Sequence, residues 1–144
     1  MLRVIFACVH NAGRSQMAAA FFNAFADPGA ACAVSAGTHP SDRVHAEVVA
    51  AMREVDIDLS RAVPQLLTGA LLKDASMLVT MGCGEECPFV PGLQREDWPL
   101  PDPKGKDDNA VRAIRDEVRM RVAELAVRLA VVRGAQSEQN GGEA

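Results

Sequence analysis

Short apolar runs alternate with segments of helical periodicity, and this alternation restricts the possible folds more than any other feature. The run at residues 2–7 is apolar and β-branched, the pattern of a strand buried on both faces. Strands are expected at residues 2–7, 31–35, 77–81 and 95–100. Helical spacing predicts helices at residues 14–26, 42–55 and 109–132, with a turn or two of helix within 66–73. The sequence therefore predicts an α/β fold, a single domain with a four-stranded parallel sheet flanked by helices.

The length and composition fit one small globular domain. The 144 residues are 49% apolar and 24% charged, enough for a single core. We expect the domain at residues 1–133, followed by a polar, glycine-rich tail at 134–144. The net charge of −4 argues against a nucleic-acid or anionic-membrane partner. The apolar run at 2–7 is too short for a signal peptide or membrane span, so we expect a cytoplasmic protein. The protein is also expected to be a monomer.

The segment between the first strand and the first helix predicts an oxyanion-binding loop. Successive backbone N–H groups in such a turn point inward, and the helix N-terminus adds its own free N–H groups. The guanidinium of Arg14 can bind two oxygens of a tetrahedral anion, and this positive field favours the thiolate form of Cys8. Gly13 gives the backbone freedom, Ser15 can donate to the Cys8 sulfur, and Asn11 can brace the loop. The predicted loop residues are Cys8, Val9, His10, Asn11, Ala12, Gly13, Arg14 and Ser15.

The plain alternative is that Cys8 is a buried strand-end cysteine and Arg14 a surface residue. The sequence has no Gly-Lys-Ser or Gly-Lys-Thr, so a nucleotide-binding loop is not expected. Among the other candidates, His39 and His45 are predicted on the surface and Cys32 in the core.

Asp102 lies between two prolines, which stiffen its loop and can hold the carboxyl in place. Departure of an oxygen from a bound oxyanion needs a proton, which Asp102 could supply. Cys8, Cys83 and Asp102 each follow a predicted strand, so all three can meet at the carboxyl end of the sheet. The alternative is an ordinary aspartate of a turn.

A second pair of thiols, Cys83 and Cys87, lies among glycines and before a proline. In a regular helix their Cα atoms would be about 6 Å apart, so a disulfide between them needs a loosened turn, which Gly82 and Gly84 would make easier. A zinc site would need two further ligands that the sequence does not offer, and two unrelated buried thiols are the other alternative. The exposed flank of glutamates favours a reactive pair, and no metal or cofactor is expected.

The combination of Cys8-x5-Arg14-Ser15, the thiols at 83 and 87, and Asp102-Pro103 resembles the thioredoxin-coupled arsenate reductases built on the low-molecular-weight tyrosine phosphatase fold. Gln16-Met17-Ala18 and the segment at residues 34–38 are also similar to that family. The resemblance runs from residue 1 to about residue 130. It implies that the fold is that of the low-molecular-weight phosphatases.

The resemblance also implies a mechanism. Cys8 attacks arsenate held by the loop and Arg14, while Asp102 protonates the departing oxygen. Cys83 then attacks the Cys8–arsenic adduct, arsenite leaves, and Cys87 moves the disulfide to 83–87, where thioredoxin reduces it. Such a relay needs a reactive first thiol and an accessible last one.

Two departures from the family pattern matter. Thioredoxin-coupled members space the last two cysteines more widely, and the shorter spacing of Cys83 and Cys87 also resembles relatives that use mycothiol or another small thiol. Some members bind potassium near the loop through two carboxylates. Ala19 and Gln65 stand at the positions that align with them, so no potassium site of that kind is expected.

Two other functions stay open. A phosphotyrosine phosphatase would share Cys8, Arg14 and Asp102, but such enzymes carry aromatic residues after the Asp-Pro, where this chain has Lys104, Gly105 and Lys106 and no tyrosine anywhere. A metalloid-binding sensor would explain the thiols as soft ligands but leaves the loop unexplained.

Overall fold

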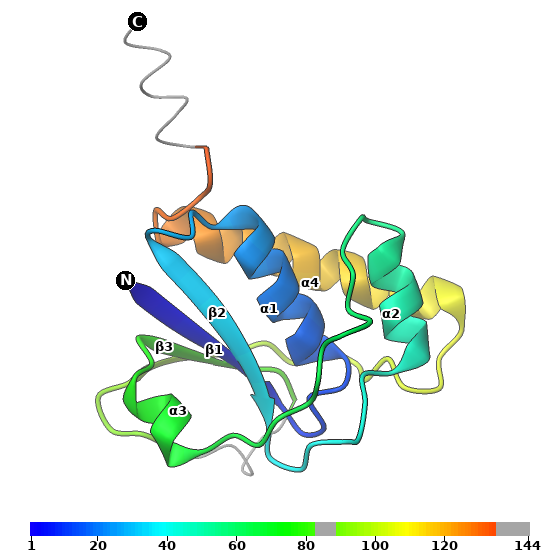
Figure 1. Cartoon of the computed structure of the whole chain (residues 1–144), viewed down its shortest axis with the longest axis horizontal. Coiled ribbons are helices and arrows are strands. Elements are labelled where there is room, and N and C mark those ends of the chain that lie inside the picture. Colours follow the sequence, from blue (N-terminus) through cyan, green and yellow to red (C-terminus); the bar gives the residue numbers. More distant parts are fainter. Residues whose placement is uncertain (83–88, 135–144) are drawn as a thin grey trace, which may run out of the picture.

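The computed structural model describes residues 1–82 and 89–134 and confirms the predicted four-stranded parallel sheet. The elements are β1 (Leu2–Cys8), α1 (Arg14–Phe25), β2 (Ala31–Gly37), α2 (Ala46–Arg53), α3 (Gly69–Lys73), β3 (Met77–Thr80), β4 (Gln94–Asp97) and α4 (Asp108–Arg128). The strands run parallel in the order β2-β1-β3-β4. In Figure 1, α1, α2 and α4 lie on one side of the sheet and α3 on the other. Within the described ranges, no helix is both long and apolar enough to cross a membrane.

The central strand β1 supplies a core on each face of the sheet. Val4 and Phe6 pack with α1 and α4 in the larger core, whereas Ile5 and Ala7 pack with α3 in the smaller one. Successive side chains of a strand point to opposite faces, so a strand covered on both sides must be apolar throughout. The apolar run that predicted this strand is thus explained by its central position.

The second helix begins four residues later than the sequence pattern predicts. It starts at Ala46, so Ser41 is not its N-cap, and that prediction is wrong. Instead, the Ser41 N–H donates to the carbonyl of His10, and the His45 N–H donates to the carbonyl of Ala12. Residues 41–45 are therefore used to hold the loop after β1, and only the residues beyond them are free to form a helix.

The bounds of the remaining elements agree with the predictions only in part. The turn or two of helix expected within 66–73 is confirmed as α3, which begins after Thr68, whose Oγ1 accepts from the Leu71 N–H at 3.2 Å. Helix α4 ends at Arg128 and not at 132, because Val131 and Val132 return toward the end of α1. Strand β4 ends at Asp97 and does not reach residue 100.

Cys32 lies on β2, which is an edge strand of the sheet. Its side chain is partly exposed, so the expectation of a core residue is wrong. His39 is exposed, as predicted, while His45 is half-buried next to the loop.

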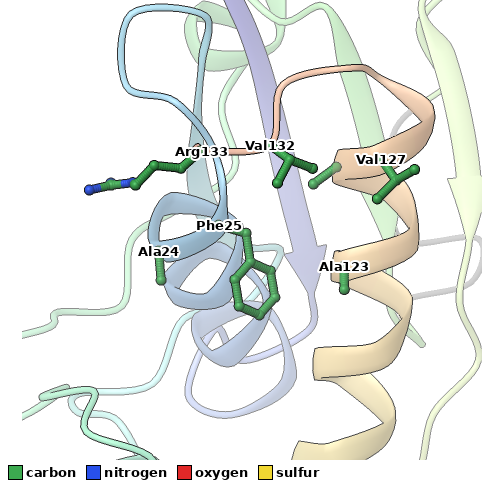
Figure 2. A pocket seen from close by; sticks show the side chains of 7 residues that line it. Ala24, Phe25, Ala123, Val127, Val132 and Arg133 are labelled. Carbon is green, nitrogen blue, oxygen red and sulfur yellow. The ribbon is translucent and has the colours of Figure 1, made fainter. Parts of the chain in front are cut away.

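A shallow apolar hollow of about 330 Å³ lies between the end of α1 and α4. Figure 2 shows the ring of Phe25 from α1 between these elements, with Ala123 and Val127 from α4 on the opposite wall. Because α1 starts beside the carboxyl end of β1 and runs back along it, this hollow lies at the amino end of the strands. It is therefore separate from the loop at Cys8.

Glu54, next to the last residue of α2, joins this helix to α4. Its carboxylate oxygens lie 2.7 Å from Arg112 Nη2 and 2.8 Å from Arg115 Nη1, and the same Arg115 nitrogen donates to the carbonyl of Ala51 at 2.9 Å. Hydrogen bonds from Arg112 and then Arg115 lower the pKa of Glu54 from its ordinary 4.5 to about 2. The charged form of this carboxyl is therefore the form that stabilises the helix pair.

Glu54→Gln is expected to lower the free energy of unfolding at pH 7, with a difference from wild type that shrinks in acid. A carboxyl with a lowered pKa in the folded state stabilises fully above its unfolded value, here 4.5, and loses this effect as the pH falls toward 2. Urea unfolding of both proteins at a series of pH values measures the difference. Glu117→Gln, which removes a single i,i+4 pair with Arg121 and no contact to a second arginine, is the control and should change stability less. A Glu54 effect of equal size at pH 7 and pH 3 would contradict the prediction.

Candidate active site

In the loop after β1, the backbone carbonyl groups point outward and accept hydrogen bonds from neighbouring segments. Each carbonyl of residues 8–13 accepts a hydrogen bond of 2.8–3.2 Å from outside the loop or from the helix that follows. The donors are the N–H groups of Thr38, His39, Ser41, His45 and Met17 and the side-chain amide of Gln16. No acceptor within residues 1–82 and 89–134 takes up the N–H groups of residues 9–15. With the carbonyls fixed on the outside, these N–H groups are left for an anion on the inside, together with the first N–H groups of α1.

Cys8 is the last residue of β1 and is buried at the base of this loop. Its sulfur lies 2.9 Å from Ser15 Oγ, and Asn11 Nδ2 donates to the same oxygen at 2.7 Å. Because Ser15 Oγ accepts from Asn11, its own hydrogen is left to point at the sulfur. A hydrogen bond to sulfur favours the thiolate, the nucleophilic form of cysteine.

Asn11 is the most constrained residue of the loop. It is fully buried and has a φ of +51°, a left-handed conformation that asparagine adopts more readily than most residues with a Cβ. Its side chain therefore reaches Ser15 from a fixed backbone position, which agrees with the bracing role expected for it.

Arg14 is buried, with 8% of its surface exposed, so the alternative of a plain surface arginine does not fit the structure. Its Nη1 donates to the carbonyl of Leu100 at 3.0 Å, and its Nη2 lies 3.9 Å from Asp102 Oδ2. Asp102 is half-exposed, and its other oxygen accepts from the Lys104 N–H at 3.0 Å. The candidate acid and the candidate anion-binding cation, 88 positions apart in the sequence, thus meet at one side of the loop.

Three glycines leave room for these contacts. A Cβ on Gly13 would lie 2.7 Å from Pro103 Cγ, and a Cβ on Gly37 would lie 2.6 Å from the carbonyl oxygen of Val9. Gly82 has a φ of +95°, and a Cβ there would overlap Arg14 Nη1. From the sequence, Gly13 was expected to provide only backbone freedom, and no role at the site was predicted for Gly37. The available signals were that Gly37 closes the predicted strand at 31–35, with one residue between them, and that Gly82 directly follows the predicted strand at 77–81.

The other predicted site residues have different outcomes. Val9, His10 and Ala12 lie in the loop, and His10 Nδ1 is 3.1 Å from the carbonyl of His39. Cys83 and Cys87 lie outside the described residues. Within the parts of the chain that the structure describes, no group of three or more His, Cys, Asp or Glu residues is gathered as a metal site.

The fold and this loop define a class of small α/β proteins that carry a cysteine in a strand-to-helix loop at the carboxyl end of the central strand. The sequence model of the family described as low molecular weight phosphotyrosine protein phosphatase matches residues 3–135. The chain belongs to this family, and the fold expected from the sequence resemblance is confirmed.

Several relatives carry reductase names. The chain is 33% identical over 132 residues to the glutaredoxin arsenate reductase of Synechocystis, covering 90% of this chain and 99% of that one. It is 35% identical to the thioredoxin-dependent arsenate reductase of Corynebacterium glutamicum, with a TM-score of 0.78, and the match covers 90% of this chain but 62% of that longer one. A solved structure described as an arsenate reductase in oxidized state is 31% identical, with a TM-score of 0.79. The match covers 90% of this chain and 99% of that one.

Gly82→Ala is expected to weaken the binding of a tetrahedral oxyanion by about tenfold, because the new Cβ displaces the Arg14 guanidinium and costs a charge-assisted hydrogen bond. Titration calorimetry with inorganic phosphate measures the affinity. Gly92→Ala is the matched control, since Gly92 also has a positive φ, +82°, but nothing within 4 Å of the added Cβ. Both variants should lose about 1 kcal/mol of stability from the left-handed conformation, and only the first should lose phosphate affinity. Equal phosphate affinities in the two variants would contradict the role given to Gly82.

Proposed function

We propose that this chain is an arsenate reductase that binds arsenate in the loop of residues 8–15. The observation that carries the proposal is the buried Cys8 sulfur with its Ser15 hydrogen bond, at the base of a loop whose carbonyls are all held outside. Arsenate is a tetrahedral oxyanion, and its oxygens can accept from the inward N–H groups while Arg14 binds two of them. The reductase names of full-length relatives support the choice of arsenate over phosphate.

In the first step of the proposed reaction, the Cys8 thiolate attacks arsenic and an oxygen leaves as water. Asp102 would supply the proton for that oxygen. Its half-exposed carboxyl lies 3.9 Å from the Arg14 guanidinium. The product is a thiol–arsenic adduct that still contains As(V).

In the second step, the Cys83 thiolate attacks the Cys8 sulfur. The sulfur–arsenic bond breaks, its electron pair reduces As(V) to As(III), and arsenite leaves with a Cys8–Cys83 disulfide behind it. Cys87 then attacks Cys83 and frees Cys8, so that the disulfide at 83–87 receives two electrons from an external thiol. This part of the proposal rests on the sequence spacing and on Gly82, which brings the chain against Arg14 immediately before Cys83.

We propose thioredoxin as that external thiol, in a cytoplasmic, monomeric enzyme. The Corynebacterium relative is named for thioredoxin, whereas the Synechocystis relative is named for glutaredoxin, so the family uses more than one reductant. The short spacing of Cys83 and Cys87 keeps a small-thiol route as the alternative. A reducing compartment fits a mechanism whose thiols must return to the reduced state.

Replacing single cysteines by serine separates these routes. Arsenate-dependent NADPH oxidation with thioredoxin and its reductase is expected to fall at least about a thousandfold in Cys8→Ser, Cys83→Ser and Cys87→Ser, because each removes one sulfur of the relay. Cys87→Ser should still release one arsenite per enzyme. Cys32→Ser is the matched control and should keep wild-type turnover, since Cys32 lies on the edge strand β2.

The contrary outcomes are distinct. Full thioredoxin-coupled activity in Cys87→Ser would overturn the relay of three thiols and support the small-thiol route. Failure of the wild type to reduce arsenate with thioredoxin, glutaredoxin or a small thiol would overturn the reductase proposal. Hydrolysis of an aryl phosphate under those conditions would then favour the phosphatase.

A further inference from the structure

Gln16, the third residue of α1, turns its side chain back into the loop that precedes the helix. The side chain is buried, and its Nε2 donates to the backbone carbonyl of Asn11 at 3.0 Å and to Asn11 Oδ1 at 3.2 Å. Since the carbonyl can only accept, it fixes which end of the Gln16 amide faces Asn11. The nitrogen end must be the one that also meets Asn11 Oδ1.

A second donor reaches the same Asn11 oxygen from a distant segment. The backbone N–H of Gln65 donates to Asn11 Oδ1 at 2.9 Å, across 54 positions of sequence. A backbone N–H can only donate, so the oxygen end of the Asn11 amide must face Gln65 and Gln16. The nitrogen end is therefore left to face Ser15.

The orientation of this amide decides what Ser15 does. With Asn11 Nδ2 donating to Ser15 Oγ at 2.7 Å, the Ser15 hydrogen is left for the Cys8 sulfur at 2.9 Å. If the amide were turned over, Asn11 Oδ1 would attract the Ser15 hydrogen, and the sulfur would lose its donor. A thiolate without that donor is less stable relative to the thiol.

We propose that Gln16 is a positioning residue for the nucleophile: it keeps the Asn11 amide in the orientation in which Ser15 donates to Cys8. Gln16 acts through Asn11 and Ser15, since both hydrogen bonds of its side chain go to Asn11. The proposal rests on the proposed function only in taking Cys8 as the nucleophile, because the hydrogen bonds exist before any substrate binds.

The test measures the reactivity of Cys8 without arsenate. In a background with Cys32, Cys83 and Cys87 replaced by serine, the rate of Cys8 alkylation by iodoacetamide is followed against pH. Gln16→Met removes the donor and keeps the length of the side chain. The midpoint of its pH profile should rise by about half a unit, so that alkylation below the midpoint is about threefold slower.

A double-mutant cycle distinguishes positioning from a general loss of structure. Ser15→Ala should raise the midpoint at least as far as Gln16→Met does, since it removes the final hydrogen bond. In the Ser15→Ala background, Gln16→Met should produce no further shift, because its effect passes through the Ser15 hydroxyl. Shifts that add in the double variant would overturn the proposal.

Gln65→Met is the matched control. Its side-chain Nε2 donates to the carbonyl of Ser35 at 2.9 Å, while the contact to Asn11 comes from its backbone N–H, which the substitution keeps. The same Gln→Met change should therefore leave the alkylation midpoint in place. An equal shift in both variants would overturn the specific role of Gln16.

Thermal unfolding reports whether each variant is folded. If Gln16→Met does not fold, Gln16→Glu replaces it, since an ionised carboxylate keeps the shape but has no donor. Any direct effect of its charge persists in the Ser15→Ala background, whereas the positioning effect disappears there. An unchanged midpoint in a folded variant would overturn the proposal even if arsenate reduction is confirmed, and a shifted midpoint would support it even if arsenate is not the substrate.

Discussion

The outward-held carbonyl groups of residues 8–13 are the constraint on which the rest of the structure depends. Their partners come from the connection after β2 and from the first turn of α1. Residues 41–45 remain outside α2 for this reason, and Gly37 must lack a Cβ to let Val9 approach. A fixed backbone can offer N–H groups to an anion without rearranging when it arrives, which makes electrostatic stabilisation effective.

Because β1 is a central strand, segments from both of its neighbours lie beside the loop that follows it. β1 lies between β2 and β3, so the segments that leave both neighbours pass beside Cys8. From one side come Thr38 to His45, and from the other come Gly82 and, after β4, the turn with Leu100 and Asp102. Arg14 is the side chain that contacts this second side. Its buried guanidinium therefore lies between the candidate anion-binding loop and the candidate acid.

The sequence predicted what depends on local pattern and missed what depends on distant partners. The apolar run of β1 and the spacing of Cys8, Arg14 and Ser15 were sufficient for the strand, the turn and the start of α1. The late start of α2 could not be predicted, because a serine before a helical apolar pattern has the signature of an N-cap. Only the structure shows that the Ser41 N–H donates to the distant carbonyl of His10. Gln16 entered the sequence analysis only as part of the family resemblance, with no role of its own, and a backbone N–H such as that of Gln65 has no sequence signature.

The same loop could serve a phosphatase or a reductase, and the difference lies in which nucleophile attacks second. In a phosphatase, water attacks the phosphorus of a phosphoryl–cysteine intermediate. In a reductase, a thiol must attack the cysteine sulfur of the adduct, so that the electron pair of the sulfur–arsenic bond reduces the arsenic. A thiol can do this only if the chain brings it close to Cys8. Gly82 has a left-handed φ and no room for a Cβ beside Arg14, the candidate anion-binding side chain, and Cys83 is the next residue in the sequence. A phosphatase has no use for thiols in that segment, so the Cys83 and Cys87 pair of the sequence favours the reductase.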